Sequence, residues 1–192
     1  LQLMYLGERL DGIQPGRFIE VGPGSGEITN TLLKAGWTGI VYDLSEETIE
    51  KLGERLAGAL RDRRLVAVKG DFLSAPVPSQ PEAGVDLVIS CMVMEHLDDD
   101  AEVRFLRHAA SHLKMGGRMI GLVPASRCHW GIEDDIAGHY RRYDKDSLHE
   151  LFRKTGWKPV HVAGLTYPIS NLLLPFSNCL LYTSPSPRDR TR

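Results

Sequence analysis

Three glycines at alternate positions follow a short apolar run, in the segment Glu20-Val21-Gly22-Pro23-Gly24-Ser25-Gly26. Glycine adopts backbone conformations that other residues avoid, so such a turn lets backbone N–H groups approach a ligand closely. The helix expected after the turn adds unpaired N–H groups and a positive partial charge. The Glu20 carboxylate, two positions before Gly22, suits a ligand with an ammonium group and would repel a pyrophosphate. Taken alone, the loop predicts a polar, nucleotide-like ligand, and the alternative is a plain tight turn with a solvated Glu20.

Two further acidic residues end apolar runs that we interpret as strands. Asp43 lies about 20 residues after the glycines, where a carboxylate can accept both ribose hydroxyls of a nucleotide. Its alternative role is to cap the following helix. Asp71 follows the next run, in Gly70-Asp71-Phe72, and an Asp-Phe pair in a loop is usually structural. The glycine loop and Asp43 together predict an adenosine-containing ligand.

An acid and an imidazole, Glu95 and His96, stand side by side after a fourth apolar run. Imidazole accepts protons near neutral pH, so the pair could act as a general base. The alternative is that the two side chains only orient the loop that carries them. A further imidazole, His139, lies in residues 126–143, which are too long and polar for a simple connection. Such segments are usually lids or binding loops. We therefore expect residues 126–143 to hold the substrate.

Within this segment His139 could take a proton from an attacking hydroxyl or amine. Arg141 or Arg142 could hold a substrate carboxylate or phosphate through paired N–H groups, with Tyr143 and Trp130 beside them. The alternative is a paired surface, in which nearby acids neutralise both arginines, while Trp130 and Tyr140 only anchor a lid. Those acids are Glu133, Asp134 and Asp135.

The elements that position these side chains lie between about residues 17 and 165, where β-rich apolar runs alternate with helical stretches. This alternation is typical of an α/β protein with a parallel sheet covered on both faces. The predicted strands are residues 17–22, 38–43, 65–69, 85–91, 118–123 and 157–165. Predicted helices follow the glycine loop as far as Gly36 and cover about 45–60, 98–114 and 144–155, with Gly116-Gly117 ending the third. Pro159 places the last strand at a sheet edge.

Three segments resemble class I, Rossmann-like S-adenosylmethionine-dependent methyltransferases. The acid before the alternate glycines resembles their motif I. Residues 86–97 resemble the family's D-x-V-x-S/C-x-x-V-x-E-H-L segment, and residues 138–143 resemble the G-H-x-R-R-Y stretch of a bacterial branch whose members are often named simply methyltransferase-domain proteins. The resemblance reaches about residue 165 and implies a three-layer sandwich around a mostly parallel, twisted sheet.

The resemblance also implies S-adenosylmethionine as the cofactor, whose ammonium group Glu20 would face. Asp71 would contact the adenine amino group, Phe72 would flank the ring, and Cys91 and Met92 would line the cleft between sulfonium and substrate. The implied cofactor-binding residues are Glu20, Gly22, Gly24, Gly26, Asp43, Asp71, Phe72, Cys91 and Met92. The implied reaction is in-line methyl transfer to an oxygen, nitrogen or carbon of a small molecule, with Glu95, His96 and His139 as catalytic candidates. The alternatives are a nicotinamide-dependent oxidoreductase, which shares the ribose acid, and a non-catalytic or truncated cofactor-binding domain.

The composition of the 192-residue chain limits the classes of partner that we expect it to bind. A net charge of −2 and a pI near 6.4 provide no cationic surface for nucleic acid. Three scattered cysteines predict neither a disulfide framework nor a zinc site, so we expect a reducing, cytoplasmic setting and no metal. We find no secretory signal and no run that could span a bilayer. The oligomeric state is not predictable.

We expect one methyltransferase domain in residues 1–165, followed by an apolar segment, 166–180, that packs on the sheet or, alternatively, touches lipid at the membrane surface. Residues 181–192 resemble translated sequencing-adapter sequence and are left out of fold reasoning. If they are non-native, the family's C-terminal antiparallel strand is missing and the fifth strand has an exposed edge. The chain begins without Met, which is consistent with a fragment.

Overall fold

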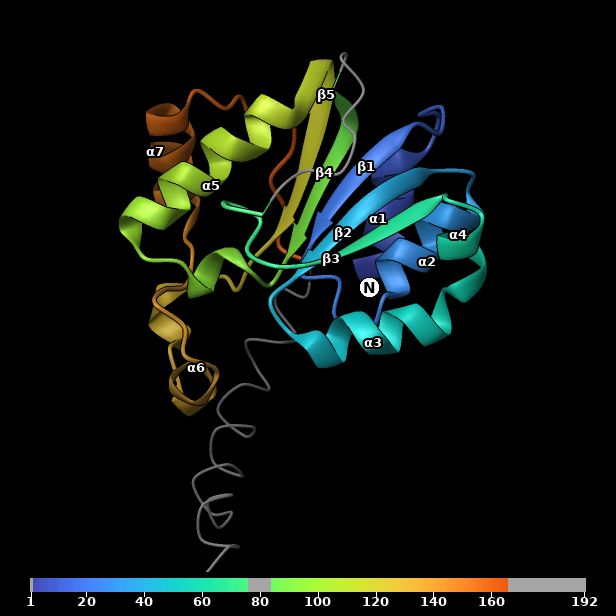
Figure 1. Cartoon of the computed structure of the whole chain (residues 1–192). Helices are drawn as coiled ribbons and strands as arrows, with labels where there is room; N and C mark the ends of the chain where they lie inside the picture. The colour runs from blue at the N-terminus through green and yellow to red at the C-terminus, as the bar shows by residue number, and fades with distance from the viewer. Residues whose placement is uncertain (1, 76–83, 166–192) are drawn as a thin grey trace, which may run out of the picture.

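The computed structural model describes residues 2–75 and 84–165, and at its centre is a five-stranded, all-parallel sheet (Figure 1). The strands are β1 (Arg17–Val21), β2 (Thr38–Asp43), β3 (Leu65–Lys69), β4 (Val85–Cys91) and β5 (Leu113–Leu122). Their spatial order is β3-β2-β1-β4-β5, so the chain changes direction across the sheet between β1 and β4. Ligands of open parallel sheets bind outside the carboxyl ends of the strands at such a switch point.

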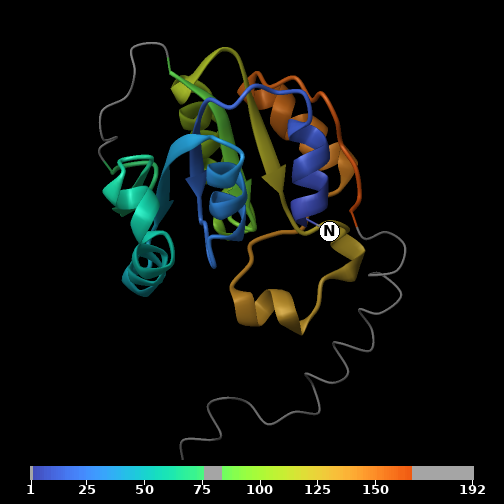
Figure 2. The same cartoon turned by 90° about the vertical axis from the view of Figure 1, so that its right-hand side faces the viewer.

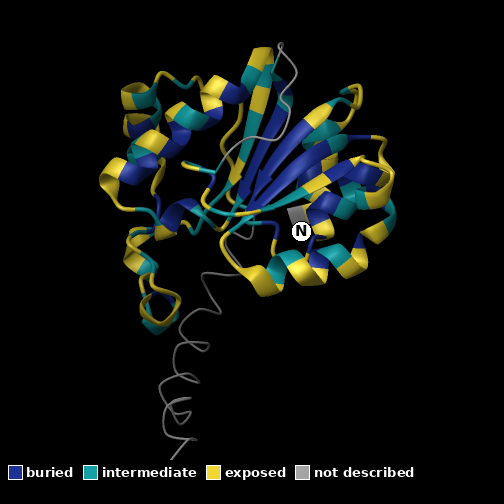
Figure 3. Cartoon of the chain, viewed as in Figure 1, coloured by how far each residue is buried: buried dark blue, intermediate teal, exposed yellow. Residues whose placement is uncertain are grey.

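Helices cover both faces of the sheet and give it three layers (Figure 1). The helices are α1 (Gln2–Leu10), α2 (Glu27–Lys34), α3 (Glu46–Arg55), α4 (Ala57–Arg61), α5 (Asp99–His112), α6 (Ile132–Ala137) and α7 (Lys145–Thr155), with short 3-10 turns η1 (Met94–His96) and η2 (Arg127–His129). Successive strand residues point to opposite faces: Phe18 packs with α1–α4, and Ile19 packs with α5 and α7. The central strands are buried on both faces (Figure 3), and the predicted α/β fold is confirmed.

Several predicted element boundaries are wrong. The helix expected over residues 45–60 is two helices that meet at Leu56, and Ser45 rather than Asp43 caps the first, accepting the Thr48 N–H at 3.2 Å. Gly116 and Gly117 do not end a helix; they lie within β5, beside an irregularity in its pairing with β4. At this point β5 has extra residues relative to β4, and they form a bulge. Gly116 permits the bulge because glycine can adopt its φ of +79°.

The strand predicted over residues 157–165 is absent from the structure. Val160 is 86% exposed, and Pro159 cannot donate a backbone hydrogen bond. Within the described residues β5 is therefore an edge of the sheet. Two short helices lie where none was expected: α1 before the first strand, and α6 inside residues 126–143.

Residues 166–192, which include the apolar segment and the adapter-like tail, lie outside the described residues. Among the residues that are described, no helix has the length and apolar character needed to cross a bilayer.

Candidate functional site

The glycine loop joins β1 to α2, and its glycines have φ of +68° at Gly22, +51° at Gly24 and +74° at Gly26. A Cβ at Gly22 would collide with Val93, and one at Gly26 would collide with Leu52. A Cβ at Gly24 would meet no protein atom within 4 Å. Packing therefore accounts for two of the glycines and leaves open space beside the third, as a closely approaching ligand requires.

Glu20 lies in β1 and is 1% exposed. Its Oε2 accepts a hydrogen bond from the Thr29 hydroxyl of α2 at 2.6 Å. Burial raises the pKa of Glu20 to about 7, although the Thr29 hydrogen bond opposes the shift. A buried carboxyl with so high a pKa is a good partner for a cation that enters the site, because the cation restores the stability of the ionised form.

The acids of the next two strands lie in ordered turns. Asp43 ends β2, and its Oδ1 accepts the Ser45 N–H at 2.8 Å. Asp71 follows β3, is exposed, and accepts the Leu73 N–H at 3.0 Å. Among the residues that the structure describes, each carboxylate keeps one oxygen without a hydrogen bond. Both can therefore offer an acceptor to a ligand at the carboxyl edge of the sheet.

Phe72 does not share the exposure of its neighbour Asp71. It is 2% exposed, and its ring packs edge-on against Tyr42 and Phe105 at centroid distances of 5.4 and 5.5 Å. The ring is also 4.7 Å from that of His108. Phe72 is thus part of the core between the sheet and α5, which leaves little of its surface to flank an adenine ring.

Cys91 ends β4, next to β1, and lies within electrostatic range of two carboxyl groups. Burial raises the pKa of its thiol to about 12, with further contributions from Glu20 and Glu95. The thiol is therefore protonated at neutral pH and is no nucleophile. Met92 follows with φ of +56° and is 42% exposed. Such a conformation is uncommon for a residue with a side chain and here turns the chain away from the strand end.

Asp134 of α6 organises the loop after β5. Its buried carboxylate accepts hydrogen bonds from the Gly131 N–H at 2.9 Å, from His139 Nδ1 at 2.8 Å, and from Arg142 Nε at 2.8 and 2.9 Å. Burial alone would raise the pKa of Asp134, but these hydrogen bonds outweigh it and hold the pKa below its ordinary value. An ionised Asp134 fixes the proton of His139 on Nδ1, so Nε2 is the nitrogen with a lone pair.

Nε2 of His139 lies 4.0 Å from Oε1 of Glu95. Glu95 is completely buried, and both its carboxyl oxygens lack a hydrogen-bond partner among the described residues. Burial raises the pKa of Glu95, and the charge of Asp134 adds to the shift, while the residue's own backbone N–H and the charge of His139 oppose it. The ring of the exposed His96 lies 4.8 Å from that of His139. The structure thus brings the three predicted catalytic residues together.

The two arginines and Tyr143 are all held by acidic side chains of the protein itself. Nη1 of Arg141 lies 2.8 Å from Asp99 and 2.9 Å from Glu102, and Arg142 is bound to Asp134. Tyr143 is 4% exposed and donates its hydroxyl to Glu102, and burial raises its pKa. The three side chains fasten the loop to α5 and α6, so their prediction as substrate ligands is not favoured; the predicted pairing of the arginines is present, with partly different acids.

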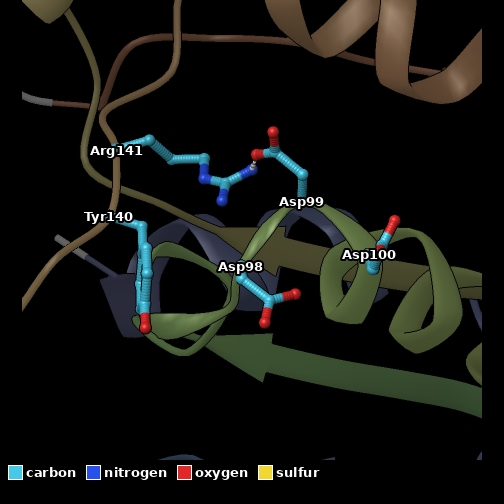
Figure 4. A pocket seen from close by; sticks show the side chains of 5 residues that line it. All are labelled: Asp98, Asp99, Asp100, Tyr140 and Arg141. Carbon is cyan, nitrogen blue, oxygen red and sulfur yellow. Dashed lines mark ion pairs between the residues drawn. The ribbon is translucent and has the colours of Figure 1, made fainter.

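Trp130 is the remaining predicted substrate residue, and it is 41% exposed with its indole N–H donated to Asp135 at 3.0 Å. Beside this loop, Figure 4 shows an open hollow lined by Asp98, Asp99, Asp100, Tyr140 and Arg141. Arg141 turns toward Asp99, and Asp98 caps α5 by accepting the Ala101 N–H at 2.7 Å. The glycine loop does not line this hollow, which is therefore separate from the predicted cofactor site.

Two anchors were not singled out from the sequence. Thr29 gave no signal there, although its position in the helix after the glycines faces Glu20. Glu102, which is 6% exposed and binds both Arg141 and Tyr143, lay on the predicted helix face that turns inward. An acid at an inward position of an amphipathic helix is unusual enough to indicate a buried partner.

The methyltransferase domain family matches residues 2–162 of the chain, which include every residue of this site. The chain belongs to this family. A class I, S-adenosylmethionine-dependent methyltransferase is therefore confirmed, and the nicotinamide-dependent oxidoreductase is excluded. Figure 2 shows α6 and its flanking loops beyond the carboxyl ends of the strands, on the side where ligands of this fold bind.

The relatives of the chain include proteins named uncharacterized methyltransferases. One, from Geobacillus sp. strain WCH70, is 29% identical over 154 residues, which cover 72% of this chain and 68% of the relative. Another, from Bacillus mycoides strain KBAB4, is 30% identical over 105 residues, which cover 55% of this chain and 45% of the relative. The match thus spans less than half of the second relative.

Solved structures show the same fold at low sequence identity. The glycopeptide N-methyltransferase MtfA aligns with a TM-score of 0.61 at 19% identity, over 80% of this chain and 77% of its own. The 1,6-didemethyltoxoflavin-N1-methyltransferase of Burkholderia thailandensis, solved with its substrate and S-adenosylhomocysteine, aligns with a TM-score of 0.64 at 23% identity, over 82% of this chain and 66% of its own.

Proposed function

We propose that this methyltransferase acts on a small-molecule acceptor, transferring a methyl group in line to an oxygen, nitrogen or carbon nucleophile. The observation that carries the cofactor half of the proposal is the pairing of a buried Glu20 with open space beside Gly24, at the switch point of the sheet. The small-molecule acceptor is supported by the similar 1,6-didemethyltoxoflavin-N1-methyltransferase, whose structure holds bound 1,6-didemethyltoxoflavin. Bound S-adenosylmethionine supplies an activated methyl group on its sulfonium. The chain then contributes mainly by holding the two reactants in line, an effect worth several kcal/mol.

Each strand end along this edge would hold one part of the cofactor. Glu20 would bind the ammonium group, Asp43 the ribose hydroxyls and Asp71 the adenine amino group. The glycine loop would let the backbone approach, and Cys91 with Met92 would border the sulfonium. Phe72 would act indirectly, by packing the turn that carries Asp71 against α5.

His139 would accept the proton of the acceptor at Nε2. Its Nδ1 is held by ionised Asp134 at 2.8 Å, which stabilises the imidazolium that results. Glu95 would orient the ring from the other side, and His96, which is exposed, would border the acceptor. Burial and the neighbouring His139 lower the pKa of His96, although a hydrogen bond to the Gly138 backbone opposes the shift. The lowered pKa keeps His96 neutral at pH 7.

A screen of small molecules for S-adenosylhomocysteine release in the presence of S-adenosylmethionine tests the activity. With an acceptor in hand, His139→Gln should lower kcat by about 10²–10⁴, the usual contribution of a general base. Affinity for S-adenosylhomocysteine should stay within about twofold, and His149→Gln, on the exposed face of α7, is the matched control. An unchanged kcat in His139→Gln would remove His139 from the mechanism.

A further inference from the structure

Glu95, His96 and His139 form a cluster of three side chains with ligand atoms within 4.8 Å of one another. Two imidazoles and one carboxylate are a donor set that binds zinc and other divalent first-row metal ions. Glu95 and His96 come from the turn η1 after β4, and His139 comes from the loop after α6. The three residues are not close together in the sequence, so they form no recognisable metal-binding motif. For that reason the sequence predicted no metal site.

The carboxyl group of Glu95 is the second observation that points to a ligand. It is completely buried, and neither oxygen has a hydrogen-bond partner among the described residues. Leaving a buried polar group unpaired destabilises the fold, and more strongly when the group is charged. His139 Nε2, at 4.0 Å, is too far from Oε1 for a hydrogen bond but faces it.

The outer contacts of both imidazoles suit metal ligation. His139 directs Nδ1 to Asp134, and His96 makes a hydrogen bond to the Gly138 backbone. Ligating histidines commonly engage their other ring nitrogen with a carboxylate or a backbone carbonyl, which fixes the ring orientation. Asp134 is itself anchored by Arg142 and by the Gly131 N–H, so it is held in place before any ion arrives.

We propose that Glu95, His96 and His139 bind one divalent transition-metal ion, represented by Zn²⁺, with Asp134 as the outer partner of His139. Metal–ligand bonds of about 2.0–2.2 Å require the three atoms to approach to roughly 3 Å of one another. Rotation of the exposed His96 side chain can bring its nitrogen closer, and Glu95 and His139, 4.0 Å apart, must also approach each other. Three protein ligands leave a fourth position open, as in catalytic rather than structural zinc sites.

With the ion bound, Nε2 of His139 is a ligand and cannot accept a proton. An acceptor hydroxyl in the open position would instead have its pKa lowered by the ion and would release its proton to solvent water before it attacks the methyl group. The proposal concerns ion binding alone and does not rest on methyl transfer. Its failure would leave His139 as the base, and its success would replace His139 by the ion in that role and leave the proposed methyl transfer unchanged.

The experiment is a titration of the chelator-treated full chain with Zn²⁺ by calorimetry, and with Co²⁺ followed by visible absorption. One site should bind both ions. Loss of an outer partner of a ligand typically lowers metal affinity by roughly 10–100-fold. Because His96 is proposed as a ligand itself, His96→Gln should lower the affinity of this site for the ions by more than that. His96 is exposed, so the variant should fold, and its thermal melt checks this.

The matched control is His108→Gln. His108 and His112 are one turn apart on α5 with Nε2 atoms 3.0 Å apart, and they are the competing imidazole pair. The Co²⁺ spectrum and the affinity of the proposed site should survive in His108→Gln. Absence of binding in the native chain, loss of the site in His108→Gln, or equal affinity in His96→Gln would each overturn the proposal.

Discussion

Burial of the Glu20 carboxyl group is costly before any cofactor binds. Its folded-state pKa of about 7 lies above the ordinary value of 4.5, so the folded protein binds this proton more tightly than the unfolded chain. The associated stability is fully present below pH 4.5 and is lost as the pH rises through about 7. At alkaline pH the folded, ligand-free protein carries a buried charge whose side-chain hydrogen bond, within the described part of the chain, comes from Thr29.

Glu20→Gln should remove this cost because glutamine keeps the shape and can still bond the Thr29 hydroxyl. We expect the free energy of unfolding of the ligand-free variant to exceed that of the native chain near pH 8, by up to about 3 kcal/mol, and to differ little near pH 4. Urea unfolding at several pH values measures it. Glu54→Gln, on the exposed face of α3, should show no such pH-dependent difference.

Gly24 is the loop position where a side chain would meet a ligand rather than the protein. Gly24→Ala should cost about 1–2 kcal/mol of stability, because φ of +51° is strained for alanine. The folded variant should lose S-adenosylhomocysteine binding, because its methyl group enters the space that is open in the free protein. Thermal melting and calorimetry separate the two effects, and full affinity in a folded Gly24→Ala would show that the cofactor lies elsewhere.

At the scale of elements, the loop after β5 is fastened by a buried polar contact. Tyr143 and Arg141 both bind Glu102 of α5, and Tyr143 pairs with Ala125 across a short parallel bridge. This contact fixes the segment that carries His139. Residues 126–143 therefore resemble a docked arm more than a free lid.

Tyr143→Phe should destabilise the fold by about 1–3 kcal/mol, because the Glu102 carboxylate loses a buried donor. Tyr140→Phe is the matched control: that ring is 64% exposed, and its loss of a hydroxyl should change stability by less than about 0.5 kcal/mol. Urea unfolding of both variants makes the comparison. Equal stabilities would mean that Tyr143 does not anchor the arm.

The elements differ in how far the sequence could predict them. Strands β1 to β4 were predictable because each is an apolar run flanked by turn residues. The break at Leu56 and the bulge at Gly116 were not, because both depend on how a segment meets its neighbours. The apolar residues of 157–165 suggested a strand, but a strand needs a pairing partner and none lies beside them in the described residues.

At the scale of the whole molecule, the candidate site combines two kinds of arrangement. Glu20, Asp43 and Asp71 lie at successive strand ends, so the rule for parallel sheets was sufficient to bring them to one edge. The contact between Glu95 and His139 joins two loops that no periodicity relates. That part of the site could be anticipated only as a list of candidate side chains, because the fold of residues 126–143 decides which of them meet.

Cofactor binding should stabilise the whole fold. A ligand at 100 times its Kd adds about 2.7 kcal/mol to the free energy of unfolding. For a domain of this size that corresponds to a rise in Tm of roughly 5–11 °C. Differential scanning fluorimetry with S-adenosylhomocysteine checks this, with NADH as the control ligand that should cause no shift.

The most direct test of the central claim, that Glu20 receives the cofactor's ammonium group, is calorimetric titration with S-adenosylhomocysteine as a function of pH. Binding requires ionised Glu20, whose pKa in the free protein is about 7. The affinity should therefore rise about tenfold per pH unit between roughly pH 5 and 7 and then level off. An affinity independent of pH across this range, or no binding heat at millimolar ligand, would contradict the account.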